Sequence, residues 1–230
     1  MTVKLISYSF PSSETYEKGI DDVQDLVSYC AKVSNPANQA SMETSERLIS
    51  YLIKHKHWSP FEMASACLEI ETTRDIARQI LRHRSFSFQE FSQRYADINS
   101  LGDNFITREA RLQDTKNRQN SVYTDNVLLK KEWYNKQMAL IDLAKETYNW
   151  AIENGIAKEQ ARCVLPEGNT KSKLYMNGSI RSWIHYIDLR AGNGTQLEHR
   201  QIALECATEL AKIFPLIKKL TLESTSGDSE

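Results

Sequence analysis

The chain concentrates arginine in one short segment. Five of its thirteen arginines fall within residues 74–94, although lysine is the commoner cation in the rest of the sequence. Arg74, Arg78 and Arg82 recur at every fourth position, so on a helix they would form a single charged stripe. Arginine is the residue that holds phosphate or carboxylate groups in a fixed, two-pronged geometry. The segment therefore indicates an anion-binding surface, although a solvated helix face would show the same pattern.

The segment at residues 86–95 is rich in aromatic residues and is predicted to be a strand. Because alternate side chains of a strand share a face, Glu90, Ser92 and Arg94 would project together on one side. A carboxylate, a hydroxyl and a guanidinium suit a nucleotide: arginine and serine for phosphate, and glutamate for a sugar hydroxyl or a base N–H. The polar, solvated face of an antiparallel strand would give the same alternation.

The overall composition limits the classes of protein to which the chain can belong. It has 230 residues, 29 Lys and Arg against 30 Asp and Glu, and a net charge of -1. Such a balance argues against a binder of bulk nucleic acid, which normally carries a basic excess. The length favours one domain, since domains average roughly 150 residues. The hydrophobic share of 40% supports a folded core but leaves a polar surplus, which suggests a wet interior, a wet subunit interface or long loops.

Targeting and redox signals point to a cytoplasmic protein. No run of 18 apolar residues occurs, so no membrane contact is expected, and the first ten residues lack the pattern of a secretory signal. The four cysteines form no C-x-x-C pair, so no metal site is expected, and all four are predicted to be reduced thiols in the core. These cysteines are Cys30, Cys67, Cys163 and Cys206.

Hydrophobic spacing predicts an alternation of strands and helices. Strands are predicted at residues 3–10, 63–71, 86–95 and 172–177. Helices are predicted at residues 21–34, 41–57, 73–82, 126–154, 159–164, 179–190 and 196–214. Residues 97–125 are polar without clean periodicity and are predicted to be loop with broken helix. No internal repeat or linker divides the chain.

Several motifs in this sequence resemble those of one enzyme family. Arg82, His83 and Arg84, followed by seven residues and then Ser92, form the R-H-R-x7-S signature of flavin-dependent thymidylate synthases. Three further segments resemble the same family in the same order: residues 55–62 (HKHWSPFE), 161–166 (ARCVLP) and 177–190 (NGSIRSW to DLR). The motifs extend over most of the chain, whereas residues 97–125 match no motif and resemble a variable insertion.

The resemblance implies an activity, a fold and an assembly. Family members methylate dUMP to dTMP with 5,10-methylenetetrahydrofolate as carbon donor, FAD as redox cofactor and NADPH as reductant. The implied fold is α+β, with a mixed or antiparallel central sheet flanked by helices in a single domain over residues 1–220. The implied assembly is a homotetramer with shared active sites in the cytoplasm, or in the host cytoplasm if the source is viral. Residues 221–230 are expected to be a disordered tail.

The resemblance also assigns site residues by position. The implied cofactor-binding residues are Ser34, His57, Ser59, Glu62, Arg82, His83, Arg84, Ser85, Glu90, Asn177, Arg181 and His185. The implied substrate-binding residues are Gln79, Arg82, Glu90, Phe91, Ser92, Gln93, Arg94, Arg162 and Arg190. For His57 and His185 a purely structural role, as a helix C-terminal cation and as a helix histidine with its own partners, stays open.

Arg190 is the implied catalytic residue, in contact with the uracil ring. A permanent cation beside uracil favours loss of the N3 proton, and arginine does not give up its own proton. The resulting anion is more electron-rich at C5, the carbon that must attack. Ser92 has no obvious base partner in the sequence and is interpreted as a substrate ligand, so no protein nucleophile is expected.

Three other classes explain part of the sequence. A nucleic-acid-binding protein would account for the arginine stripe and the aromatic strand, but the net charge of -1 speaks against it. A serine hydrolase would use Ser92 with His83 or His57, but no G-x-S-x-G motif is present. A structural oligomer is the third. Partners are therefore expected to be small molecules and copies of the same chain, without nucleic acid or membrane.

Overall fold

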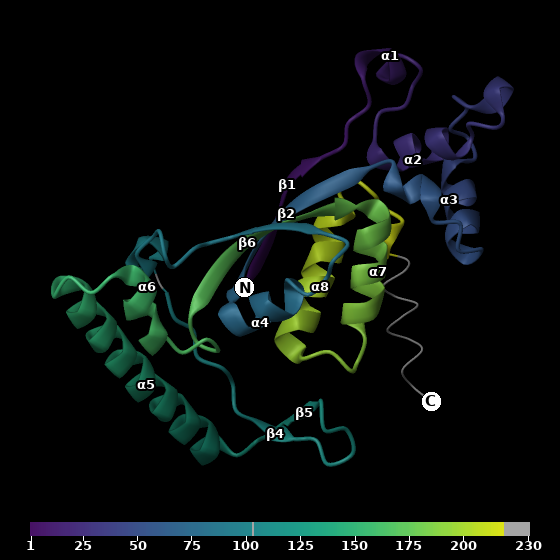
Figure 1. Ribbon diagram of the computed structural model, residues 1–230. Coiled ribbons are helices and arrows are strands. Elements are labelled where there is room, and N and C mark those ends of the chain that lie inside the picture. The colour runs from purple at the N-terminus through teal and green to yellow at the C-terminus, as the bar shows by residue number, and fades with distance from the viewer. Residues whose placement is uncertain (103, 219–230) are drawn as a thin grey trace. The chain divides into compact units, whose positions relative to one another are not determined.

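The computed structural model describes residues 1–102 and 104–218 (Figure 1). The chain forms two compact units that are interleaved along the sequence. Among the described residues, unit 1 comprises residues 1–70, 83–88 and 175–218, and unit 2 comprises residues 71–82, 89–102 and 104–174. The predicted single domain over residues 1–220 stays a prediction, and the predicted tail at residues 221–230 lies outside the described residues.

The elements confirm most of the alternation that hydrophobic spacing predicted. The strands are β1 Thr2–Tyr8, β2 Ser65–Thr73, β3 Ser87–Glu90, β4 Arg111–Gln113, β5 Ser121–Tyr123 and β6 Lys171–Ser179. The α-helices are α1 Ser13–Tyr16, α2 Val23–Ala31, α3 Ser45–Lys54, α4 Arg74–Ile80, α5 Val127–Glu153, α6 Lys158–Ala161, α7 Ile180–Ala191 and α8 Leu197–Leu210. Short 3-10 helices are η1 Pro36–Asn38, η2 Ser59–Glu62, η3 Ile98–Leu101 and η4 Arg162–Val164.

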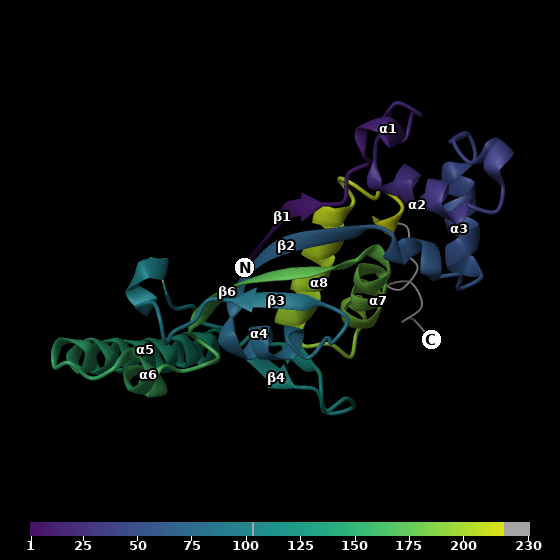
Figure 2. The same ribbon diagram turned by 45° about the horizontal axis from the view of Figure 1, so that its top comes forward.

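The main sheet has the strand order β1-β2-β6-β3 and is flanked by helices (Figures 1 and 2). Cross-strand side-chain pairs show that β2 and β6 are antiparallel. The Lys173 ammonium lies 2.8 Å from Glu71, and the Tyr175 hydroxyl donates to Glu69 at 2.8 Å, so later residues of β6 face earlier residues of β2. This mostly antiparallel sheet confirms the expected α+β fold class.

In unit 1, helices α7 and α8 pack on each other and α8 packs on β1 (Figure 1). Helix α7 begins after Ser179, whose hydroxyl caps it by accepting from the Ser182 N–H at 3.2 Å. Trp183 is fully buried, and its indole N–H donates to the Ala66 carbonyl at 3.0 Å. A single indole thus fixes α7 against β2, because a buried N–H needs a partner.

In unit 2, the long helix α5 is delimited by local signals. The Asn126 side chain caps its N-terminus by accepting from the Leu129 N–H at 3.0 Å, and Gly155 follows its end with a φ of 77°. The buried amide of Gln137 bonds both the N–H and the carbonyl of Arg108, at 2.8 and 2.9 Å. These two hydrogen bonds attach part of the polar insertion to α5.

Two expectations around the arginine segment are wrong. Strand β3 ends at Glu90, because the Ser92 carbonyl accepts from the Tyr95 and Ala96 N–H groups and turns the chain. Strand alternation therefore stops there, and Glu90, Ser92 and Arg94 do not share a strand face. Helix α4 ends at Ile80, so Arg82 lies outside the helical stripe.

The polar insertion contains structure that its sequence did not indicate. Residues 111–113 pair with residues 121–123 in the antiparallel hairpin β4–β5. The strands have only three residues each, too few for an alternation to be recognised. In the described part of the chain, no helix has both the length and the apolar character needed to span a bilayer.

Gly178 on β6 offers a test of packing in unit 1. A Cβ at this position would lie 2.4 Å from the ring of Phe86, which itself packs edge-on against Trp183 at 4.8 Å. Gly178→Ala should therefore lower the free energy of unfolding by about 1–3 kcal/mol, the usual penalty for overpacking a core. Urea denaturation gives the measurement.

The matched control for this prediction replaces the Phe86 ring, with which the new Cβ would clash, by a smaller side chain. Adding Phe86→Leu to Gly178→Ala should recover part of the loss, so the double variant is more stable than the sum of the two single effects predicts. Additive losses would show that the two residues do not clash.

Candidate functional site

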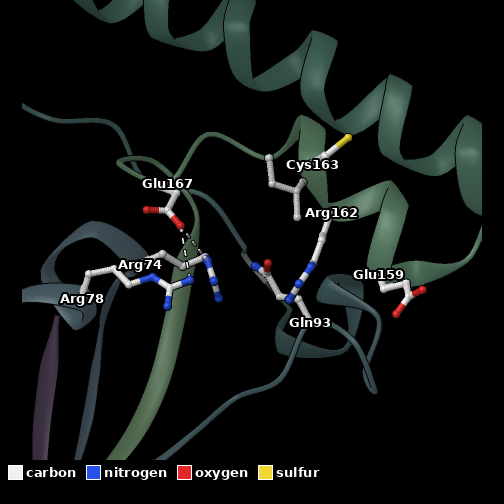
Figure 3. A pocket seen from close by; sticks show the side chains of 8 residues that line it. Arg74, Arg78, Gln93, Glu159, Arg162, Cys163 and Glu167 are labelled. Carbon is white, nitrogen blue, oxygen red and sulfur yellow. Dashed lines mark ion pairs between the residues drawn. The ribbon is translucent and has the colours of Figure 1, made fainter. Parts of the chain in front are cut away.

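A polar cavity of about 370 Å³ lies in unit 2 (Figure 3). Its lining comes from α4, from the turn after β3, and from the segment that runs from α6 through η4. The lining residues are Arg74, Arg78, Gln93, Glu159, Arg162, Cys163, Leu165 and Glu167. Three guanidinium groups in one cavity are suited to a ligand that carries phosphate or carboxylate.

Arg74 is the most deeply buried of these cations, with only 7% of its surface exposed. Its guanidinium lies 3.8 Å from Glu90 and 3.8 Å from Glu167, and the same Glu167 lies 3.5 Å from Arg78. Burial lowers the pKa of Arg74, while Glu90 acts in the opposite direction. Because the ordinary arginine pKa lies above about 12, the group stays charged, and the two carboxylates compensate its burial.

Glu90 belongs to this internal network. Its carboxylate accepts a hydrogen bond from the Ser172 hydroxyl at 2.8 Å in addition to its ion pair with Arg74. The side chain therefore points toward α4 and β6. This placement explains why Glu90 does not lie beside Arg94, which instead pairs with Glu159 at 3.8 Å.

Gln93 gives the cavity a buried side-chain donor that a ligand could satisfy. The residue is 3% exposed, and its side-chain nitrogen has no hydrogen-bond partner among the described residues. Figure 3 shows the Arg162 side chain extending toward it. A buried donor without a partner costs about 1–3 kcal/mol, so an acceptor atom of a ligand would relieve this cost.

The predicted substrate residues are only partly brought together. Gln93 and Arg162 line the cavity directly; Glu90 and Arg94 reach it through ion pairs with the lining residues Arg74 and Glu159. Four others in unit 2 are not among the lining residues: Gln79, Arg82, Phe91 and Ser92. Among these, the Phe91 N–H is engaged with the Lys173 carbonyl at 2.8 Å.

Sequence reasoning missed the two acidic residues of the cavity, Glu159 and Glu167. A signal for them existed in the charge count, because five closely spaced arginines in a chain of net charge -1 require carboxylates from elsewhere. The expected core position of the cysteines also fails at Cys163, which is exposed and lines the cavity, whereas Cys206 is buried as expected.

Unit 1 brings together a second set of predicted residues, on η2 and α7. Arg181 donates to the Glu62 carboxylate at 2.6 Å. One turn further along α7, the ring of His185 lies edge-on against Trp58, with centroids 4.5 Å apart. Burial and then the Arg181 charge lower the pKa of His185, so this ring is neutral at pH 7. His57 directly precedes Trp58 in the chain, and its ring lies 6.1 Å from that of Tyr51 on α3.

The R-H-R segment contributes to unit 1 through His83. Arg190 donates its Nε–H to His83 Nε2 at 3.0 Å, which joins the predicted catalytic arginine to a predicted cofactor residue. The Ser85 carbonyl accepts from the Ser182 hydroxyl at 3.2 Å. Four predicted residues are exposed at the surface of unit 1, and no hydrogen bond or ion pair within the described ranges joins them to this group: Ser34, Ser59, Arg84 and Asn177.

Comparisons with known proteins define the class. A family model described as "Thymidylate synthase complementing protein" matches residues 17–216. A solved structure described as a UMP/dUMP methylase PolB from Streptomyces cacaoi bound with 5-Br dUMP superposes with a TM-score of 0.76. Its sequence is 27% identical, and the match covers 98% of this chain and 94% of that chain. Together with the α+β fold and the arginine-lined cavity, this likeness defines the class of the protein as thymidylate synthase-like.

Curated relatives narrow the class to one family. A probable flavin-dependent thymidylate synthase of Paramecium bursaria Chlorella virus 1 is 48% identical over 219 residues, covering 95% of this chain and 98% of that protein. A flavin-dependent thymidylate synthase of Synechocystis sp. is 48% identical over 195 residues, covering 84% and 87%. The chain therefore belongs to the flavin-dependent thymidylate synthase family, as its motifs predicted.

The burial of Arg74 generates a prediction about stability. Glu90→Ala removes a carboxylate from a buried ion pair and should lower the free energy of unfolding by about 2 kcal/mol. Glu167→Ala is the matched control, because Glu167 lies at the same distance from Arg74 but is half exposed; its loss should be under about 1 kcal/mol. Equal losses in urea denaturation would contradict the role given to Glu90.

Proposed function

We propose that the chain catalyses the reductive methylation of dUMP to dTMP. In this proposal 5,10-methylenetetrahydrofolate donates the carbon, FAD is the flavin and NADPH is the reductant. Family membership supports the reaction type. The observation that carries the choice of substrate is the cavity of unit 2, which is lined by three guanidinium groups and by Gln93, whose buried amide nitrogen has no hydrogen-bond partner among the described residues.

A uridine nucleotide matches this cavity chemically. Its phosphate carries two negative charges that Arg162 and Arg78 can bind. Its uracil ring presents two carbonyl oxygens, and either would accept the hydrogen that Gln93 offers. The solved relative described as bound with 5-Br dUMP is consistent with this choice. Glu90 and Arg74 form the ion pair that supports the cavity lining. Phe91, Ser92, Arg94, Gln79 and Arg82 complete the proposed substrate set in unit 2.

The residues gathered in unit 1 fit a flavin. Arg181 and the exposed Arg84 provide cations for the FAD phosphates, and the neutral His185 with Trp58 provides ring surfaces for the flavin. The remaining proposed cofactor residues are Ser34, His57, Ser59, Glu62, Arg82, His83, Ser85, Glu90 and Asn177. FAD, when bound, supplies the redox chemistry that the side chains lack.

The contribution of the protein to the reaction is electrostatic. Arg190 is proposed to contact uracil and to favour the N3 anion, which makes C5 electron-rich. No described histidine or carboxylate bonds the Ser92 hydroxyl, so the absence of a protein nucleophile is proposed here too. Burial raises the pKa of the Cys30, Cys67 and Cys206 thiols, which makes them poor thiolates at pH 7.

The proposed function has a direct test. Purified protein should be yellow, release FAD on denaturation, and release tritium from C5-labelled dUMP when methylenetetrahydrofolate and NADPH are present. A colourless protein that also fails to take up added FAD would refute the proposal. Salt-sensitive binding to DNA in place of these activities would favour a nucleic-acid-binding protein.

The role of Gln93 can be tested separately. Gln93→Leu should weaken dUMP binding about 10-fold, because one hydrogen bond to the uracil is lost, worth about 1.4 kcal/mol. FAD content should stay unchanged. Gln160→Leu is the same substitution at an exposed position of α6 and should leave dUMP affinity unaltered. Titration calorimetry compares the two variants, and equal affinities would remove Gln93 from the substrate site.

The proposed assembly is a homotetramer. Helix α5 carries an exposed apolar stripe formed by Trp133, Leu140, Leu143 and Trp150, which recur at spacings of seven and three. This is the spacing by which helices pack on one another in bundles. A large exposed apolar stripe favours association, and the family resemblance supplies the number four.

A charge placed on this stripe tests the assembly. Leu143→Glu should shift the molar mass measured by light scattering to a smaller species, because association would bury the carboxylate. Asn135→Glu adds the same charge on a different exposed face of α5 and should leave the mass unchanged. A tetramer that persists in Leu143→Glu would exclude this stripe as an interface.

A further inference from the structure

Arg190 is oriented by a histidine that must be neutral. Its Nε–H donates to His83 Nε2 at 3.0 Å, so that nitrogen carries a lone pair. A neutral imidazole with an Nε2 acceptor holds its proton on Nδ1. With Nε engaged, the guanidinium loses freedom to rotate, so its two terminal NH₂ groups would meet a ligand in one orientation.

Two buried residues pack near the ring of His83. The ring of Tyr186 lies edge-on to that of His83, with centroids 4.9 Å apart, and the ring of His199 lies edge-on at 6.2 Å. The Tyr186 hydroxyl and His199 Nε2 share a hydrogen bond of 3.1 Å. Tyr186 is 1% exposed and His199 is 0% exposed. Neither residue belongs to the sets that the family motifs assign.

The positions of these residues in the fold join two helices. Tyr186 and Arg190 lie one turn apart on α7, and His199 lies on α8, which packs beside α7 in unit 1 (Figure 1). The Tyr186–His199 bond therefore fixes the helix that carries Arg190 and the ring surface on which His83 rests.

The charge state of His199 suits this arrangement. Burial first, and then the Arg190 charge and His83, lower the pKa of His199 to about 3. The His199 ring is therefore neutral at every pH at which the enzyme would work, so it adds no positive charge beside Arg190. Burial also raises the pKa of the Tyr186 hydroxyl, which stays protonated.

We propose that Tyr186 and His199 are positioning residues for Arg190. They hold the ring of His83, and His83 holds the guanidinium in the orientation that uracil requires. This inference rests on the proposed role of Arg190 in methylation. A displacement of about 1 Å at a reacting group lowers a rate about 100-fold, so a loss of orientation is measurable even when binding persists.

The kinetic test removes the hydrogen bond between Tyr186 and His199 from either side. Tyr186→Phe deletes only the hydroxyl and should lower kcat about 10-fold while the KM for dUMP stays within about threefold. His199→Leu should have the same effect, and His199→Gln, whose amide can bond the hydroxyl, should recover most of the activity. The double variant Tyr186→Phe/His199→Leu should be about as slow as the single variants, since each of them already removes the hydrogen bond that the two residues share.

The matched control is Tyr148→Phe. Tyr148 is an equally buried tyrosine of unit 2, and loss of its hydroxyl should leave kcat unchanged. Equal losses of kcat in Tyr148→Phe and Tyr186→Phe would overturn the inference, because they would reflect a general effect of deleting a buried hydroxyl.

A second readout is independent of turnover. In protein labelled with ¹⁵N-arginine, the Arg190 Nε–H resonance, assigned through its loss in Arg190→Lys, should be protected from exchange with water. Tyr186→Phe should shift this resonance and speed its exchange at least 10-fold. An unchanged resonance in both Tyr186→Phe and His199→Leu would overturn the positioning role. If wild-type protein has no dUMP turnover, the proposed function fails, and this resonance still decides the positioning separately.

Discussion

Guanidinium groups that are partly removed from water are the constraint on which this structure depends. A buried arginine cannot lose its charge, so the fold must compensate and orient it. In unit 2, Glu90 and Glu167 compensate Arg74 at 3.8 Å. In unit 1, a neutral His83 accepts from Arg190 at 3.0 Å. The end of β3 at Glu90 and the start of α4 at Arg74 place the first of these ion pairs within one unit.

This constraint explains how a chain with a net charge of -1 can belong to an enzyme family that acts on nucleotides. The total hides a local excess of arginine, and two acidic residues that pair with arginines of this segment, Glu159 and Glu167, line the cavity. A polymer binder would instead expose its cations along a surface. Cavities that combine guanidinium groups with an unpaired amide donor select small ligands, because only a small ligand satisfies all of the groups at once.

The sequence predicted local features well and long-range contacts poorly. Helix α5 was predictable from its cap at Asn126 and its stop at Gly155, and the motifs named most of the chemistry. The end of β3 at Glu90 was not, because a turn made by backbone groups leaves no alternation to count. The partners of Glu90 were also hidden, since Ser172 lies 82 positions away in sequence. Motifs therefore identified the family and proposed its site residues, while the orientations of these residues required the fold.

Most of the proposed nucleotide-binding residues lie in unit 2, with Arg190 of unit 1 as the exception, and most of the proposed flavin-binding residues lie in unit 1. Hydrogen–deuterium exchange tests this assignment most directly. Exchange of the purified, FAD-depleted protein is measured alone, with dUMP, and with FAD. We expect dUMP to slow exchange in peptides covering residues 89–94 and 159–167, and FAD to slow it in residues 57–62 and 177–185. Unchanged exchange at residues 89–94 and 159–167 in the presence of saturating dUMP would contradict it.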